Sequence, residues 1–150
     1  MLSRGHTAPY AAVLAALAAL FLFRVVGQAL VAFASVPFLP SMAHWYSGLL
    51  PYPLLLPAQL LILAAQAVVC VQFARGRGPL VTPRRRGLGH TLLVLAALYA
   101  GAMVVRYALT MAWYPERRWL GPGTIPSIFH VVLAAFIGTV GRYHATSPKL

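Results

Sequence analysis

Acidic side chains are almost missing from this chain of 150 residues, because Glu116 is its only Asp or Glu against twelve Lys and Arg. A single carboxyl group excludes a carboxylate pair for acid–base catalysis and leaves no set of buried carboxylates for proton pumping. Cysteine is equally scarce: Cys70 stands alone. One thiol excludes a disulfide framework, a cysteine metal cluster and a c-type haem attachment. We therefore expect no catalytic residue and no metal ligand set.

Charged residues of both signs make up only 9% of the chain, whereas 61% of it is hydrophobic and the mean hydropathy is +0.79. A soluble domain carries about a quarter charged residues. Most of the surface should therefore face lipid. The net charge of +11 does not indicate nucleic-acid binding, because the arginines punctuate long apolar runs.

Four apolar stretches are long enough to cross a bilayer, which takes about 20 helical residues. They cover about residues 10–36, 54–74, 88–113 and 125–143. The first stretch is too long for a signal peptide and is interrupted by Arg24, so it is predicted to be a retained helix. The sequence predicts one all-α domain, an integral membrane four-helix bundle.

Basic residues are distributed unevenly between the connecting segments. Five arginines lie between the second and third stretches, and both terminal segments add more basic residues. The opposite side has only Arg117 and Arg118, next to Glu116. The positive-inside rule therefore predicts that both termini are cytoplasmic, as N-in/C-in. Richness in Ala, Leu and Arg is typical of a GC-rich bacterial genome, and the membrane is expected to be a bacterial inner membrane.

Polar side chains of all four stretches are predicted to share one layer toward the non-cytoplasmic side, counting a rise of about 1.5 Å per residue. Arg24 and Gln28 are one turn apart on one helix face. Gln66 lies two turns below Gln59. The residues predicted to bind a ligand or a partner are Arg24, Gln28, Gln59, Arg106, Tyr107 and His130.

The two intramembrane arginines have no carboxylate at their depth, which leaves three interpretations. In the first, the arginines reach lipid phosphates while the glutamines join helices. In the second, they hold an anionic or carbonyl-rich ligand such as a lipid headgroup, quinone or carotenoid-like molecule. In the third, they meet an acidic partner protein. One haem is a further alternative, since His44 of a loop is the histidine that could meet His130.

The segment between the first two stretches has no charge and is rich in proline, and it carries His44, Trp45 and Tyr46. Tryptophan and tyrosine favour the membrane interface, so these residues are predicted to lie there and to cap the polar layer. Trp113 and Trp119 are predicted to form the matching aromatic belt from the other loop.

The segments FRVVGQ, HWYSGLLPYPLLLPAQ, RYALTMAWYPERRW and GTIPSIFH resemble a set of small four-helix bacterial membrane proteins. The Arg-x-x-Gly of the first helix and the four-span plan also resemble the DoxX-type group. That resemblance implies a link to redox or quinone-dependent membrane complexes. It assigns no functional residue.

The leading hypothesis is a non-catalytic accessory or scaffold subunit of a larger inner-membrane complex, respiratory or photosynthetic, with lipids and other membrane subunits as partners. Small residues spaced by four, Ala97 with Gly101 and Ala134 with Gly138, predict close packing inside the bundle or against a neighbour. The alternatives are a redox-linked protein that holds a quinone, lipid or haem in the polar layer, and a small oligomeric transporter.

Overall fold

The computed structural model describes residues 3–34, 36–46, 50–83, 85–115, 121 and 123–146, and no strand occurs in these ranges. Four of the helices are long and apolar enough to cross a membrane. The protein is therefore a multi-pass membrane protein, and the predicted all-α bundle is confirmed. The helices are α1 (Ser3–Ala34), α2 (Met42–Trp45), α3 (Tyr52–Arg75), α4 (Arg86–Trp113) and α5 (Thr124–Ala145).

The helix bounds lie close to the predicted stretches except at the start of α1. This helix begins at Ser3, and Pro9 lies inside it rather than at its first turn. The apolar pattern cannot reveal the additional turns, because residues 3–8 are mostly polar or small. The end of α3 follows from Gly76, which adopts a φ of 63° and donates its N–H to the carbonyls of the last helical turn.

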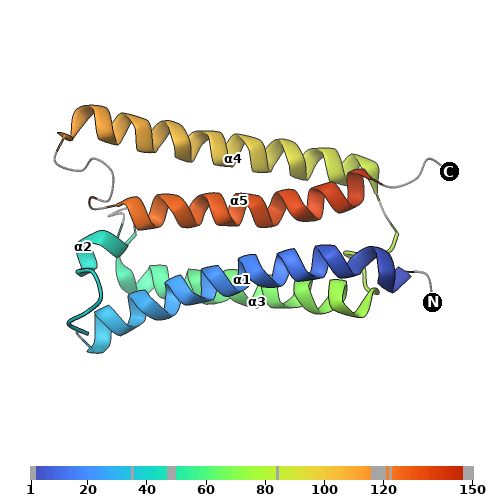
Figure 1. Cartoon of the computed structure of the whole chain (residues 1–150), viewed down its shortest axis with the longest axis horizontal. Coiled ribbons are helices and arrows are strands. Elements are labelled where there is room, and N and C mark those ends of the chain that lie inside the picture. The colour runs from blue at the N-terminus through green and yellow to red at the C-terminus, as the bar shows by residue number, and fades with distance from the viewer. Residues whose placement is uncertain are drawn as a thin grey trace.

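The long helices pack in the order α4, α5, α1, α3 rather than in a closed ring (Figure 1). Among the described residues, no Cα atom of α3 lies within 8 Å of one of α4 or α5. The short α2 contacts both α1 and α5. Both chain termini lie at one end of the molecule, the terminal end, and α2 lies at the other, the α2 end (Figure 1).

Helices α4 and α5 approach closely because small residues line their contact. A methyl group on Gly89 would lie 2.4 Å from the backbone nitrogen of Ala145, and one on Gly138 would lie 3.4 Å from Cβ of Ala96. Gly101 is different, since nothing lies within 4 Å of the position of its missing Cβ. The second small-residue pair therefore packs inside the bundle, whereas Gly101 of the first pair faces away from the rest of the chain.

The hydrophobic core lies toward the terminal end. After α3, Gly76 and Gly78 turn the chain back with positive φ values of 63° and 131°, and Val81 enters the core. The Tyr143 hydroxyl donates to the carbonyl of Val81 at 3.2 Å, and its ring meets the Phe73 ring with centroids 4.8 Å apart. The buried core cluster consists of Leu14, Phe73, Val81, Phe136, Val140 and Tyr143.

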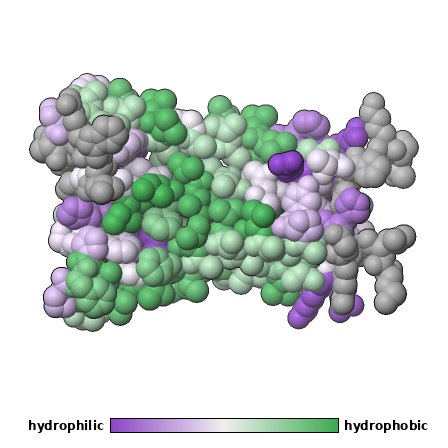
Figure 2. Space-filling model, viewed as in Figure 1, coloured by the Kyte–Doolittle hydropathy of each residue, from purple (hydrophilic) through white to green (hydrophobic). Residues whose placement is uncertain are grey.

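The outer surface of the long helices is apolar. Figure 2 shows hydrophobic residues across the middle of the face in view, while most hydrophilic residues gather toward the two ends. Phe23 of α1, Leu61 of α3 and Leu98 of α4 are each about two-thirds or more exposed. Such a surface is suited to lipid, because a soluble protein rarely exposes continuous apolar area of this extent.

Candidate ligand-binding site

A cavity of about 210 Å³ lies between α1, α3 and α5, on the side of the core toward the α2 end. Phe21 and Arg24 of α1 form the side of the cavity that is called its floor here. Both side chains are almost completely buried. The walls are mostly hydrocarbon. The polar and aromatic residues in the walls of the cavity include Gln59 of α3 and Phe129 and His130 of α5.

Arg24 places a positive charge in this cavity with only 6% of its surface exposed. Its guanidinium carbon lies 5.8 Å from the centre of the Phe129 ring, which is a cation–π contact. Its Nε has no hydrogen-bond partner among the described residues. None of those residues has an acidic side chain, because Glu116 lies outside them. Arg24 therefore keeps unused capacity for a carboxylate or phosphate.

Gln28 and Gln59, two glutamines predicted for the polar layer, form one hydrogen-bonded chain with α2. Gln59 Nε2 donates to Gln28 Oε1 at 2.9 Å, and Gln28 Nε2 donates to the carbonyl of Trp45 at 3.3 Å. The other amide atom of Gln59, Oε1, is buried without a partner in the described part of the chain. The cavity wall therefore includes an acceptor as well as a cation.

Trp45, which the sequence predicts at the membrane interface, is buried inside the protein at the α2 end. Only 5% of its surface is exposed. Its ring lies against Gly27, where a methyl group would come within 2.5 Å of a ring atom, and its Nε1 donates to the carbonyl of Pro40 at 3.0 Å. Gly27 leaves the space for this ring. As a result, α2 folds onto the end of α1.

His130 is joined to α4 by a short hydrogen bond between its Nδ1 and the hydroxyl of Tyr99. Both Arg24 and Arg106 lie close enough to His130 to interact electrostatically. Tyr99 is not among the residues predicted for the site. Its position was detectable, because it precedes Arg106 by seven residues and so lies two turns away on the same face of α4.

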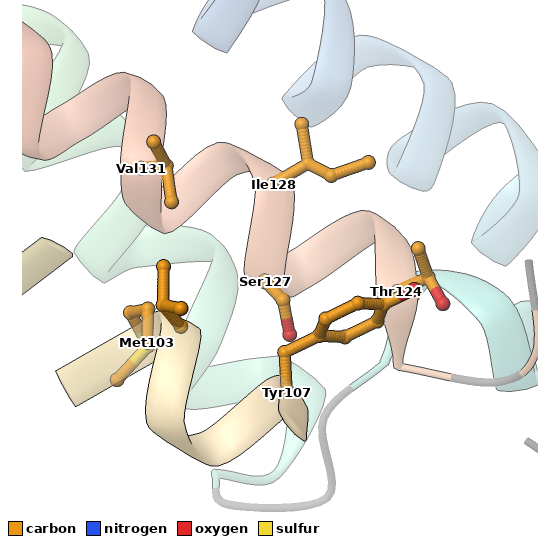
Figure 3. Close-up of a pocket in the computed structure, with 7 residues that line it drawn as sticks. Met103, Tyr107, Thr124, Ser127, Ile128 and Val131 are labelled. Carbon is orange, nitrogen blue, oxygen red and sulfur yellow. The ribbon is translucent and has the colours of Figure 1, made fainter. Parts of the chain in front are cut away.

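Tyr107 lies apart from this cavity and lines a second one of about 340 Å³ between α4 and α5. Figure 3 shows its ring extending from α4 toward Thr124 of α5. The hydroxyl of Ser127 in the same wall donates to the carbonyl of Gly123 at 3.0 Å. The residues that line this second cavity carry no charge, so it suits a hydrocarbon chain rather than an anionic group.

His44, Tyr46 and Trp113 line neither of these two cavities. His44 Nδ1 hydrogen bonds to Ser41 Oγ at 3.1 Å, and Tyr46 is half-buried. Trp113 is 70% exposed at the end of α4, and its place at the membrane interface stays a prediction. Trp119 lies outside the described residues.

Gln66 extends the polar face of α3 two turns beyond Gln59. It is 4% exposed, and both polar atoms of its side chain lack partners among the described residues. Among all the residues that the structure describes, no group of three or more His, Cys, Asp or Glu side chains is placed to hold a metal ion. The chemistry assembled here is a buried cation beside an amide oxygen and an imidazole, which is suited to binding.

Comparison of the chain with protein-family models, with curated proteins and with solved structures finds no match, so its function is argued from this cavity.

Proposed function

We propose that this protein binds the anionic group of a small molecule in the cavity between α1, α3 and α5. The observation that carries the proposal is the buried guanidinium of Arg24, which lines the cavity and whose Nε has no hydrogen-bond partner in the described part of the chain. An arginine in the middle of a spanning helix costs about 2.5 kcal/mol or more on insertion scales. A bound anion would offset that cost and would use the free donor.

The position of Arg24 favours a small ligand over an acidic side chain of another subunit. The residue lies on the cavity floor and is 6% exposed, so a second protein would have to insert a side chain between α1, α3 and α5 to reach it. A carboxylate or phosphate on a small molecule fits the same space. This binding function was the second hypothesis from the sequence, and the cavity now favours it over the leading one.

The other polar wall groups narrow the chemistry of the ligand. Gln59 Oε1 accepts a hydrogen bond, which a hydroxyl group on the ligand would supply. His130 uses Nδ1 for Tyr99, which leaves Nε2 for the ligand. We therefore propose a phosphate or carboxylate with a hydroxyl group close to it, as in many lipid headgroups.

We also propose an orientation in which the terminal end faces the cytoplasm of a bacterium. Exposed arginines gather there: Arg75 ends α3, Arg77 follows it, Arg86 begins α4 and Arg142 lies near the end of α5. Arginine in short cytoplasmic segments is the usual topology signal. The cavity would then lie in the outer half of the inner membrane.

The test uses the protein stripped of lipid in an uncharged detergent and dodecyl phosphate as the probe, with bound molecules counted by native mass spectrometry. The unmodified chain and Arg142→Met should bind one molecule. Arg24→Met should bind at least about tenfold more weakly. Arg142→Met is the matched control, because it removes the same charge outside the cavity. Equal binding by Arg24→Met and the unmodified chain would refute the proposal, as would absence of binding to either.

The accessory-subunit function is the second candidate, and the outward face of α4 favours it. Among the described residues α4 packs only against α5, and Gly101 faces open space beside the exposed Ala97. Small residues on a lipid-facing surface allow another helix to approach closely. A partner at fixed ratio in gently extracted membranes, lost in Gly101→Leu, would support this function. A chain that purifies alone would oppose it.

A further inference from the structure

We infer that the ligand enters this cavity sideways from the bilayer, through the space between α3 and α5, and that it is an anionic amphiphile rather than a water-soluble anion. The inference rests on the proposed binding function and adds the ligand class and the route. A lipid and a free anion share the phosphate or carboxylate that Arg24 would hold. They differ in the side from which they arrive.

Exposure of the lining residues locates the mouth of the cavity. On the floor, Phe21 and Arg24 of α1 are 2% and 6% exposed. At the edge, Leu50, just before α3, is 46% exposed and Ile62 of α3 is 37% exposed. The cavity therefore opens along α3, away from α1, and the residues at its edge are apolar.

The space between α3 and α5, called the α3–α5 seam, is filled near the terminal end and open near the α2 end. In the described part of the two helices all Cα atoms are more than 8 Å apart, so only large side chains can close the seam. Near the terminal end the Phe73 ring meets the Tyr143 ring and closes it. Near the α2 end, the residues that face each other across the seam line the cavity.

The α2 end is covered on the side toward water. Helix α2 contacts both α1 and α5 there, and it lies over their ends in Figure 1. Trp45 of α2 is buried against Gly27, and Gln28 holds its carbonyl. A solute from water would have to displace this cap, whereas a molecule in the bilayer meets an apolar edge.

These features fit a molecule with two parts. The anionic group would lie beside Arg24 and Gln59 on the cavity floor and wall, and a hydrocarbon chain would leave through the seam past Ile62 into the lipid. The chain adds to the affinity measured from water, because each CH₂ group that leaves water for the seam or the surrounding lipid contributes about 0.8 kcal/mol. Affinity should therefore increase with chain length for a constant anionic group.

The test compares dodecyl phosphate, inorganic phosphate and dodecyltrimethylammonium on the delipidated protein, with binding counted by native mass spectrometry. We expect dodecyl phosphate to bind at least about tenfold more tightly than inorganic phosphate, and the cationic amphiphile to leave the cavity empty. Ile62→Trp narrows the seam and should weaken dodecyl phosphate binding by about tenfold. Leu61→Trp is the matched control, because Leu61 is exposed and does not line the cavity.

Two results would overturn the inference, and they differ in what they say about the proposed function. If inorganic phosphate binds as tightly as dodecyl phosphate and Ile62→Trp has no effect, the anion comes from water, and the role of Arg24 stands. If neither phosphate binds the unmodified chain, the proposed function fails as well, and the inference fails with it.

Discussion

The two ends of this bundle are built from the same helices and differ in how their polar groups are satisfied. At the terminal end, α1, α3 and α5 enclose Phe73, Val81 and Tyr143, and the Tyr143 hydroxyl has a carbonyl partner. Toward the α2 end the same helices enclose a cavity, where Arg24 Nε and Gln59 Oε1 have none among the described residues. The terminal end has the features of a structural core, and the α2 end has those of a binding site.

This contrast indicates where the small chain obtains its stability. Aromatic rings and a turn segment close the α3–α5 seam at one end. The other end can therefore keep a cavity and a cation that has no acidic partner among the described residues. Buried polar groups without hydrogen-bond partners lower the stability of the free protein, and the rest of the structure must offset this cost. Such groups are commonly found at functional sites. Substitutions at the two ends should therefore differ in size and in sign.

The largest expected effect comes from Gly89→Ala in the contact between α4 and α5. Its new methyl group would lie 2.4 Å from the backbone nitrogen of Ala145, and backbone cannot move aside cheaply. We expect a loss of about 3 kcal/mol in the free energy of unfolding, at the upper end of overpacking effects. Thermal unfolding in mild detergent, followed by circular dichroism, measures it.

Gly101→Ala is the matched control on the same helix, because its Cβ would meet nothing within 4 Å. It should leave stability unchanged or raise it by about 0.5–1 kcal/mol, since alanine is the better helix former. Equal unfolding temperatures for the two variants would show that α4 does not pack on α5 through Gly89.

A smaller loss is expected from Gln28→Leu at the α2 end. It removes the acceptor of Gln59 Nε2 and the donor to the Trp45 carbonyl, and it should cost about 2 kcal/mol. In a background with Trp113→Phe and Trp119→Phe, the emission of Trp45 should shift to longer wavelength as α2 loosens.

The control for that variant is Gln66→Leu, a second buried glutamine in the same bundle. Its amide has no partner among the described residues, so its removal should leave the unfolding temperature unchanged or raise it. If Gln66→Leu destabilises the protein as much as Gln28→Leu does, the hydrogen-bonded chain through Gln28 has no special role.

The smallest effect is expected from Tyr143→Phe at the terminal end. The variant keeps the ring contact with Phe73 and loses the hydrogen bond to Val81, at a cost of about 1 kcal/mol. Faster tryptic cleavage at Arg77 should report the loosened turn. Tyr52→Phe is the control, because the Tyr52 hydroxyl is buried without a partner among the described residues and its loss should not destabilise. A cleavage rate unchanged from the parent chain would contradict the prediction for Tyr143.

The sequence predicts the spanning helices well, because hydropathy over about 20 residues reports the lipid environment directly. It also predicts that Arg24 and Gln28 share a face, since their spacing is fixed by the helix itself. The packing order α4, α5, α1, α3 could not be predicted from the sequence, because helix order depends on side-chain packing between distant segments. The burial of Trp45 against Gly27 and the pairing of Tyr99 with His130 depend on the same long-range packing.

The role of Arg24 in binding is best tested by the unfolding temperatures of the unmodified chain and of Arg24→Met, each with and without dodecyl phosphate. If Arg24 serves binding, Arg24→Met should be as stable as the unmodified chain or more stable in uncharged detergent, because an unpaired buried cation is removed. It should also lose the increase in unfolding temperature that the probe gives the unmodified chain. A variant that is destabilised without the probe, and still stabilised by it, would show that Arg24 holds the fold and not the ligand.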